Sequence, residues 1–313
     1  MKQFFGAFFG SILGLLITGI VMALIIGAFI AAGLKGAFDG GGGQKKFTVK
    51  ENSVLHLKIE GGITERGMDN PFEELDLGPF MPPAVLGVRG IVKSIEHAKT
   101  DDNIKGIYLD IRHVEAGFAT IEELRNALID FKTSKKFIYA YSEVYSQKSY
   151  YLATTATKLY MNPQGGMEFK GLSSQIMFMK NMFEKLGIEM QIFRHGKFKS
   201  AIEPFMLDKM SEANRLQTET YMNSIWGSML DGISKERGIS VDKLNALANN
   251  LAINSTEDAL NNKMVDGLLY EDEVMSLLKK DLKLVEKDKI VFADISKYQK
   301  AAKESRKEKR LSS

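Results

Sequence analysis

The chain has 313 residues, of which 44% are hydrophobic and 26% are charged, as is usual for globular proteins. This length suffices for one large domain or two smaller ones. The formal net charge of +3 is too small to indicate a nucleic-acid partner, and the basic run 297–310 is typical of a charged tail. Because the sequence contains no cysteine, disulfides and thiol chemistry are excluded.

The N-terminal segment is strongly apolar. Residues 4–34 carry no charge, and Ser11 and Thr18 are their clear polar residues. The run exceeds the ~20 residues that a helix needs to cross a bilayer, so we predict a retained transmembrane anchor at 1–35. A cleaved signal peptide is the alternative, but the run is too long for its apolar region. Basic residues on both sides of the run do not favour export of the body.

A glycine-rich linker is predicted at 36–50, and it includes Gly40 to Gly43. It does not match a phosphate-binding loop, because no Gly-Lys-Ser/Thr follows it and no strand precedes it. From 51 to 205 the pattern alternates between strands and helices, which predicts a mostly parallel sheet covered by helices. Thr120 with Glu123 forms a potential capping box at the start of one helix. The strands are expected at 54–61, 104–111, 137–141, 159–161 and 188–193, and the helices around 91–98, 120–131, 147–156 and 176–186.

The character of the chain changes after residue 205. A helical subdomain is predicted at 206–270, with helices that begin after Ser211, Ser240 and Ser255 or Thr256. The remaining segment, 271–313, is expected to hold a last strand at 289–295 and a basic tail, and to lead toward a second half.

One lysine is a candidate for catalysis. Lys199 lies between apolar residues, Phe198 and Ala201-Ile202, and the following Glu203-Pro204 is expected to stop a helix. A lysine acts as a general base only when it is neutral, which requires its pKa to fall by about 3 units from ~10.4, at a cost of roughly 4 kcal/mol. Burial among apolar side chains supplies such a shift. A solvated loop lysine is the alternative, and it is the usual state of this residue type.

The residues around Lys199 resemble a known motif. Gly-Lys-Phe-Lys-Ser-Ala-Ile-Glu-Pro-Phe at 196–205, with 105–111, 150–153 and 159–165, resembles the signal peptide peptidase A (protease IV) family of membrane-anchored Ser/Lys peptidases of the bacterial envelope. The likeness is to the N-terminal half of the double-length bacterial type. It implies a ββα spiral of the ClpP and crotonase kind, with Lys199 as the general base. It also implies apolar signal-peptide fragments as substrates, a homo-oligomer, and a single-pass protein of the bacterial inner membrane with its body on the periplasmic face.

The resembled family carries its nucleophile in an Ala-Ser-Gly-Gly-Tyr motif of the second half. Gln147 stands at the corresponding position here, and Lys148 and Ser149 replace the paired glycines. Because glutamine cannot accept an acyl group, half an active site is expected, to be completed by a second peptidase half or another chain. Ser146 and Ser149 are the nearest hydroxyls, but the turn that would present either as a nucleophile is not preserved.

Other chemistry is weakly indicated. The four histidines have no metal-ligand spacing, so no metal or other cofactor is expected. Ser200 is a candidate for orienting the Lys199 amine and Glu203 for holding the turn, although loop capping accounts equally well for both. We therefore expect the lysine-bearing half of a serine endopeptidase that degrades released signal peptides. The alternatives are a non-catalytic peptide-binding or assembly module, and a crotonase-like thioester enzyme, which a membrane anchor disfavours.

Overall fold

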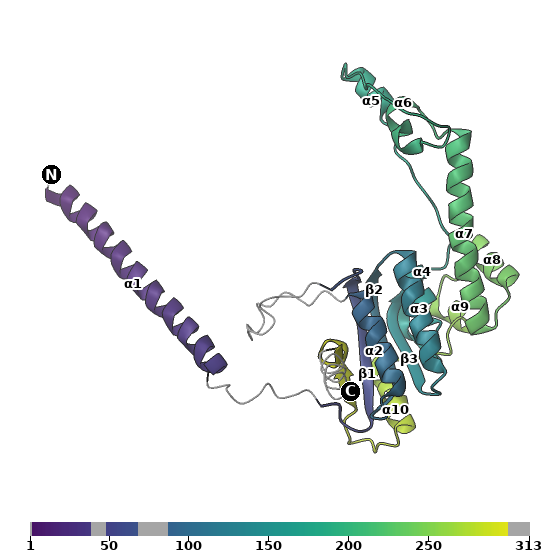
Figure 1. Ribbon diagram of the computed structural model, residues 1–313, viewed down its shortest axis with the longest axis horizontal. Coiled ribbons are helices and arrows are strands. Elements are labelled where there is room, and N and C mark those ends of the chain that lie inside the picture. The colour runs from purple at the N-terminus through teal and green to yellow at the C-terminus, as the bar shows by residue number, and fades with distance from the viewer. Residues whose placement is uncertain (1, 39–47, 68–86, 300–313) are drawn as a thin grey trace, which may run out of the picture. The chain divides into compact units, whose positions relative to one another are not determined.

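The computed structural model describes residues 2–38, 48–67 and 87–299 (Figure 1). The described residues divide into two compact units, one that contains residues 2–38 and the other residues 49–67 and 87–299. The first contains helix α1 (Lys2–Phe38), whose stretch Gly6–Ala28 has a mean hydropathy of 2.5 and is not buried by the protein. By length and composition this helix can cross a membrane. Most of the predicted linker lies outside the described residues.

The second unit is built on a six-stranded sheet with the order β5-β4-β3-β2-β1-β6, in which every neighbouring pair is parallel. This confirms the predicted α/β class. In sequence, β1 to β4 precede the helical segment, whereas β5 and β6 follow it. The sheet is therefore completed by two strands from beyond residue 205. The strands are β1 (Ser53–Gly62), β2 (Ile104–Glu115), β3 (Phe137–Tyr145), β4 (Lys158–Met167), β5 (Gly267–Leu268) and β6 (Val291–Asp294).

Helices cover both faces of this sheet. α2 (Val88–Thr100) and α3 (Phe118–Lys132) pack together and bury a stripe of aliphatic side chains. α10 (Glu271–Asp281) lies against a cluster of sheet tyrosines through Val274 and Leu278. Each fully buried aliphatic side chain contributes about 1.5–3 kcal/mol, so these two layers stabilise most of the body.

One predicted helix start is wrong. α3 begins at Phe118, with Gly117 in an extended conformation as its N-cap, and no side chain caps the first turn. Thr120 therefore already lies inside the helix, and the predicted capping box with Glu123 does not form. The helix starts earlier because Phe118 and Ala119 can adopt helical geometry directly after the glycine.

The helical segment after residue 210 follows the predicted caps. The hydroxyls of Ser211, Ser240 and Ser255 accept hydrogen bonds from backbone N–H groups at the starts of α7 (Glu212–Arg237), α8 (Val241–Asn249) and α9 (Thr256–Asn261). α7 is fixed to the body near its C-terminal end, where its buried apolar residues are Met229, Leu230 and Ile233. Its N-terminal end, by contrast, carries the segment that contains Lys199.

We call residues 172–210 the arm. It contains α5 (Lys180–Lys185), the 3-10 turn η2 (Ser200–Ile202) and α6 (Glu203–Met206). Both α5 and α6 lie beyond the N-terminal end of α7 (Figure 1). Phe183 and Phe205 stack with their ring centroids 6.1 Å apart, which joins α5 to α6.

The arm differs from the prediction in three respects. Residues 188–193 form no strand, because none of the strands in the described part of the chain lies beside them to complete a ladder. The helix expected at 176–186 shortens to α5. Finally, Glu203-Pro204 opens α6 instead of stopping a helix, because a proline in the first turn needs no intrahelical N–H partner.

Candidate active-site residues

Lys199 immediately precedes η2 and lines a hollow of about 570 Å³. The hollow is bounded only by the arm itself, through residues 193–195 and 198–202. The Lys199 side chain is exposed. The burial expected from its apolar sequence neighbours is therefore wrong for this chain by itself.

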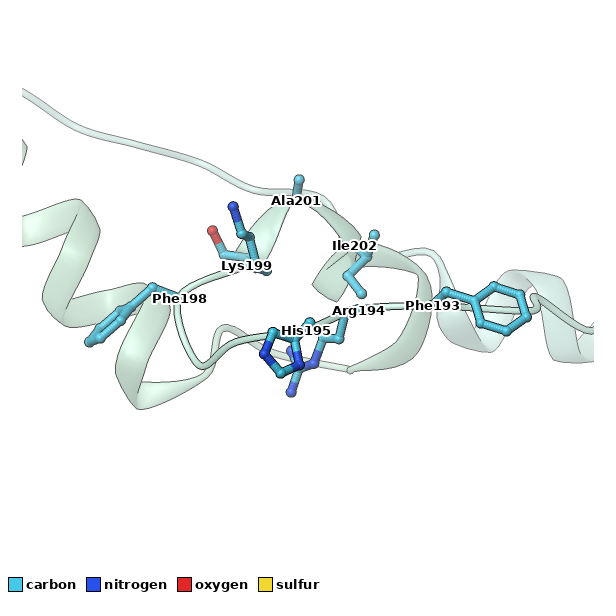
Figure 2. Close-up of a pocket in the computed structure, with 8 residues that line it drawn as sticks. Phe193, Arg194, His195, Phe198, Lys199, Ala201 and Ile202 are labelled. Atoms are coloured by element: carbon cyan, nitrogen blue, oxygen red, sulfur yellow. The ribbon is translucent and has the colours of Figure 1, made fainter.

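The aromatic neighbours of Lys199 do not cover its amine. Figure 2 shows the rings of Phe193 and Phe198 pointing away from Lys199 in opposite directions. Phe193 is 94% exposed and Phe198 51% exposed. No residue from 170 to 202 is buried, so the apolar side chains in this part of the arm have no second layer to pack against and turn toward solvent.

Glu203, four residues further along, is buried, with a relative exposure of 1%. Its carboxylate accepts hydrogen bonds from the Ser211 hydroxyl at 2.6 Å, the Ser211 backbone N–H at 3.2 Å and the Asn214 side-chain amide at 2.9 Å. Burial raises the Glu203 pKa, but these hydrogen bonds and the charge of Arg194 outweigh it, so the pKa lies below its ordinary value. The ionised carboxylate thus ties α6 to the first turn of α7.

Gln147 occupies the first turn of α4 (Gln147–Ala153), on the body. Its side-chain oxygen accepts hydrogen bonds from the backbone N–H groups of Lys170, at 2.9 Å, and Gly171, at 3.0 Å. Its side-chain nitrogen donates to the Gly171 carbonyl at 3.0 Å. The residue at the expected nucleophile position therefore holds the base of the arm.

The hydroxyls beside Gln147 are engaged in the cap of α4. Ser146 is the N-cap and accepts a hydrogen bond from the Ser149 N–H, and Ser149 is buried and donates to the Ser146 carbonyl at 2.9 Å. Lys148 donates to the Ala116 carbonyl at 3.0 Å. Neither serine lines the hollow around Lys199, so the structure does not bring a nucleophile candidate and the lysine into one site.

A charged cluster on the sheet was not anticipated. Asp110 lies 3.4 Å from the His56 ring nitrogen, without hydrogen-bond geometry, and 3.1 Å from Arg112, which also approaches Glu143 at 3.5 Å and Glu271 at 3.6 Å. Burial raises the Asp110 pKa, but the interactions with His56 and Arg112 outweigh it and lower the pKa. Asp110 and Arg112 stand two apart in β2 and so share a face, which is the signal that could have revealed the pair. Among the described residues no group of acidic or histidine side chains is arranged to hold a metal ion.

Comparison with known proteins places these residues within a peptidase domain. The model of "Peptidase family S49" matches residues 130–285, a range that contains both Gln147 and Lys199. The chain is 30% identical over 211 residues to Protease 4 of Haemophilus influenzae, which covers 65% of this chain and 34% of that protein.

Two further relatives agree. Protease 4 of Salmonella typhi is 34% identical over 198 residues, covering 61% of this chain and 32% of its own length. The chloroplastic serine protease SPPA of Arabidopsis thaliana is 29% identical over 250 residues, covering 80% and 35% respectively. The chain thus spans about a third of the length of these relatives. The sheet is of the parallel, ClpP-like kind, and residues 130–285 form a domain of peptidase family S49, of the SppA type.

Proposed function

We propose that this chain is the lysine-bearing half of a membrane-anchored Ser/Lys endopeptidase, with Lys199 as the general base. The observation that carries the proposal is the position of Lys199 in the matched S49 domain, at an apolar hollow on an arm that its own chain leaves uncovered. The serine comes from another S49 domain, on the same polypeptide or on a second chain, because Gln147 is engaged at the corresponding place here.

The surface of the arm supports completion by another domain. Large apolar side chains are exposed along it, and exposed apolar patches are typical of interaction sites. These side chains are Met177, Met182, Leu186, Ile188, Met190, Phe193 and Phe198. A second domain that covers them would also remove water from the Lys199 amine, which is the condition for a neutral lysine at neutral pH.

In the proposed reaction the neutral Lys199 amine takes the proton of the incoming serine hydroxyl while that oxygen attacks the peptide carbonyl. The resulting ammonium then returns the proton to the leaving amine. Ser200 orients the Lys199 amine, and the buried Glu203 carboxylate fixes the turn that follows it. The substrates are apolar peptides released at a membrane, to which α1 anchors the chain. We place the body on the periplasmic face of a bacterial inner membrane.

The proposal is tested by combining this chain with a serine-bearing S49 half and measuring cleavage of a fluorogenic apolar peptide. Lys199→Met should lower kcat about 10²- to 10⁴-fold, the usual contribution of a general base. Lys197→Met is the matched control, because it removes an exposed lysine two residues away, and it should leave kcat nearly unchanged. Unchanged turnover in Lys199→Met would show that the assignment of the base is wrong.

A second candidate function is a peptide-binding or assembly module without catalysis. The engagement of Gln147 and the exposure of Lys199 favour it, since both leave this chain without a working pair. It predicts that Lys199→Met alters neither peptide binding nor assembly, and that no combination with a serine-bearing half is active.

A further inference from the structure

The side chain of Gln147 is bound in an unusual way for a residue in the first turn of a helix. One carboxamide oxygen accepts from two successive backbone N–H groups, those of Lys170 and Gly171, and the carboxamide nitrogen donates to the Gly171 carbonyl. All the polar atoms of this side chain thus meet one short backbone segment, 23 and 24 residues away in sequence.

The backbone of that segment is shaped to present both N–H groups to one oxygen. β4 ends at Met167, and the Glu168 N–H still bonds to the Tyr145 carbonyl at 2.8 Å. Gly171 then has a φ of +87°, a conformation that favours glycine and turns the chain into the arm. Successive N–H groups that converge in this way form a concave donor pair for an oxygen with negative partial charge.

The chemistry of the segment specifies the group that it binds. The N–H and C=O of Gly171 together form the pair that one residue presents to its partner in an antiparallel ladder. A carboxylate would place a negative oxygen against the Gly171 carbonyl, whereas a carboxamide places an N–H there. The Lys170 ammonium pairs with Glu168 at 3.0 Å, so it does not call for an anion.

We propose that residues 170–171 form a carboxamide-binding site that the chain fills with its own Gln147. The natural occupants of such a site are a primary carboxamide and the N–H and C=O of one residue in an extended peptide. With Gln147 in place the site is closed, so the base of the arm is fixed and a peptide cannot pair there. The inference does not depend on the proposed peptidase activity.

The experiment is hydrogen exchange at the Lys170 and Gly171 amides of the full chain in detergent micelles, read by fragmentation mass spectrometry. Gln147→Ala should raise the exchange rate of both amides about tenfold, the factor that corresponds to roughly one net hydrogen bond each. Added acetamide, or N-acetylglycine N-methylamide, should slow both again. Recovery with acetamide alone indicates a side-chain carboxamide as the occupant, and recovery with the blocked glycine indicates an extended peptide.

Gln147→Met is the matched control, because it fills the same space without polar atoms. In this variant the Lys170 and Gly171 amides should exchange as fast as in Gln147→Ala, and neither probe should slow them. If Gln147→Ala does not fold, judged by exchange at Leu109 in the buried β2, Gln147→Glu replaces it, since it keeps the length of the side chain but sets a carboxylate oxygen against the Gly171 carbonyl, so both amides should exchange faster than with Gln147. Unchanged exchange in Gln147→Ala or in Gln147→Glu, or no response to either probe, would overturn the assignment.

Discussion

Replacing Glu203 should release the N-terminal end of α7 without unfolding the body. The carboxylate is buried and accepts hydrogen bonds from both Ser211 donors and from the Asn214 side chain. Glu203→Ala leaves these donors without their acceptor, which costs about 1–3 kcal/mol for each buried group that finds no water, and such costs are not fully additive. We expect a loss of about 2–3 kcal/mol in the local opening free energy, or roughly 30- to 150-fold faster amide exchange at Asn214.

The loss should remain local because the apolar residues that fix α7 to the body lie near its other end, at Met229, Leu230 and Ile233. Thermal unfolding of the body should therefore change much less than exchange at Asn214. Exchange at Leu230 is the internal control within the same helix. If Glu203→Ala leaves amide exchange at Asn214 unchanged, or accelerates exchange at Leu230 as much as at Asn214, the view that Glu203 fixes only the arm is refuted.

The same interaction should depend on pH in a defined direction. The folded-state pKa of Glu203 lies below its ordinary value of 4.5. Between these two pKa values the unfolded state therefore binds more protons than the folded state. The stabilisation is therefore complete above that value and is lost as the pH falls through the lower, folded-state pKa. Exchange at Asn214, corrected for its intrinsic rate, should accelerate on acidification in the native chain and lose this dependence in Glu203→Gln.

Two predictions concern the helical segment. Gly232→Ala places a Cβ 2.7 Å from a ring carbon of Tyr151, so it should destabilise the body by about 1–3 kcal/mol and lower Tm in calorimetry. Gly227→Ala in the same helix meets nothing within 4 Å and should stabilise by about 0.5–1 kcal/mol, and an equal effect of both would contradict the packing argument. Ser255→Ala removes a capping box with Asp258 and should cost about 1 kcal/mol, with faster exchange confined to the first turn of α9.

The elements that were predicted correctly depend on interactions between near neighbours in sequence. Serine caps bind N–H groups three residues away, so Ser211, Ser240 and Ser255 could be identified without tertiary information. The strands of the body carry short apolar runs because both of their faces are buried, as at Ile107, Tyr108 and Leu109 of β2. The parallel sheet then follows from the alternation of these runs with helices.

The missing strand in the arm and the contacts of Gln147 could not be predicted because these segments depend on distant partners. Residues 188–193 have the composition of a strand, but strand formation requires a neighbouring strand, and none lies beside the arm. The contacts of Gln147 with residues 170–171 bring together the first turn of α4 and the segment after β4, which have no local pattern in common. A glutamine side chain has no hydroxyl or thiol that could act as the nucleophile, but the sequence does not indicate the interaction that Gln147 makes instead.

Lys199 illustrates the same limit at the candidate site. Its apolar neighbours predict burial, but an apolar side chain desolvates a lysine only when another layer holds it in place, and Phe193 and Phe198 here turn outward. The exposed amine and the exposed rings therefore have a common physical cause, the missing second layer. A surface that covers the arm would bury the rings and desolvate the amine together, so turnover of Lys199→Met in the presence of a serine-bearing S49 half separates the two proposed functions. A catalytic half requires the Lys199 amine and loses turnover in this variant, whereas a module that only assembles keeps its arm interface and has no turnover to lose.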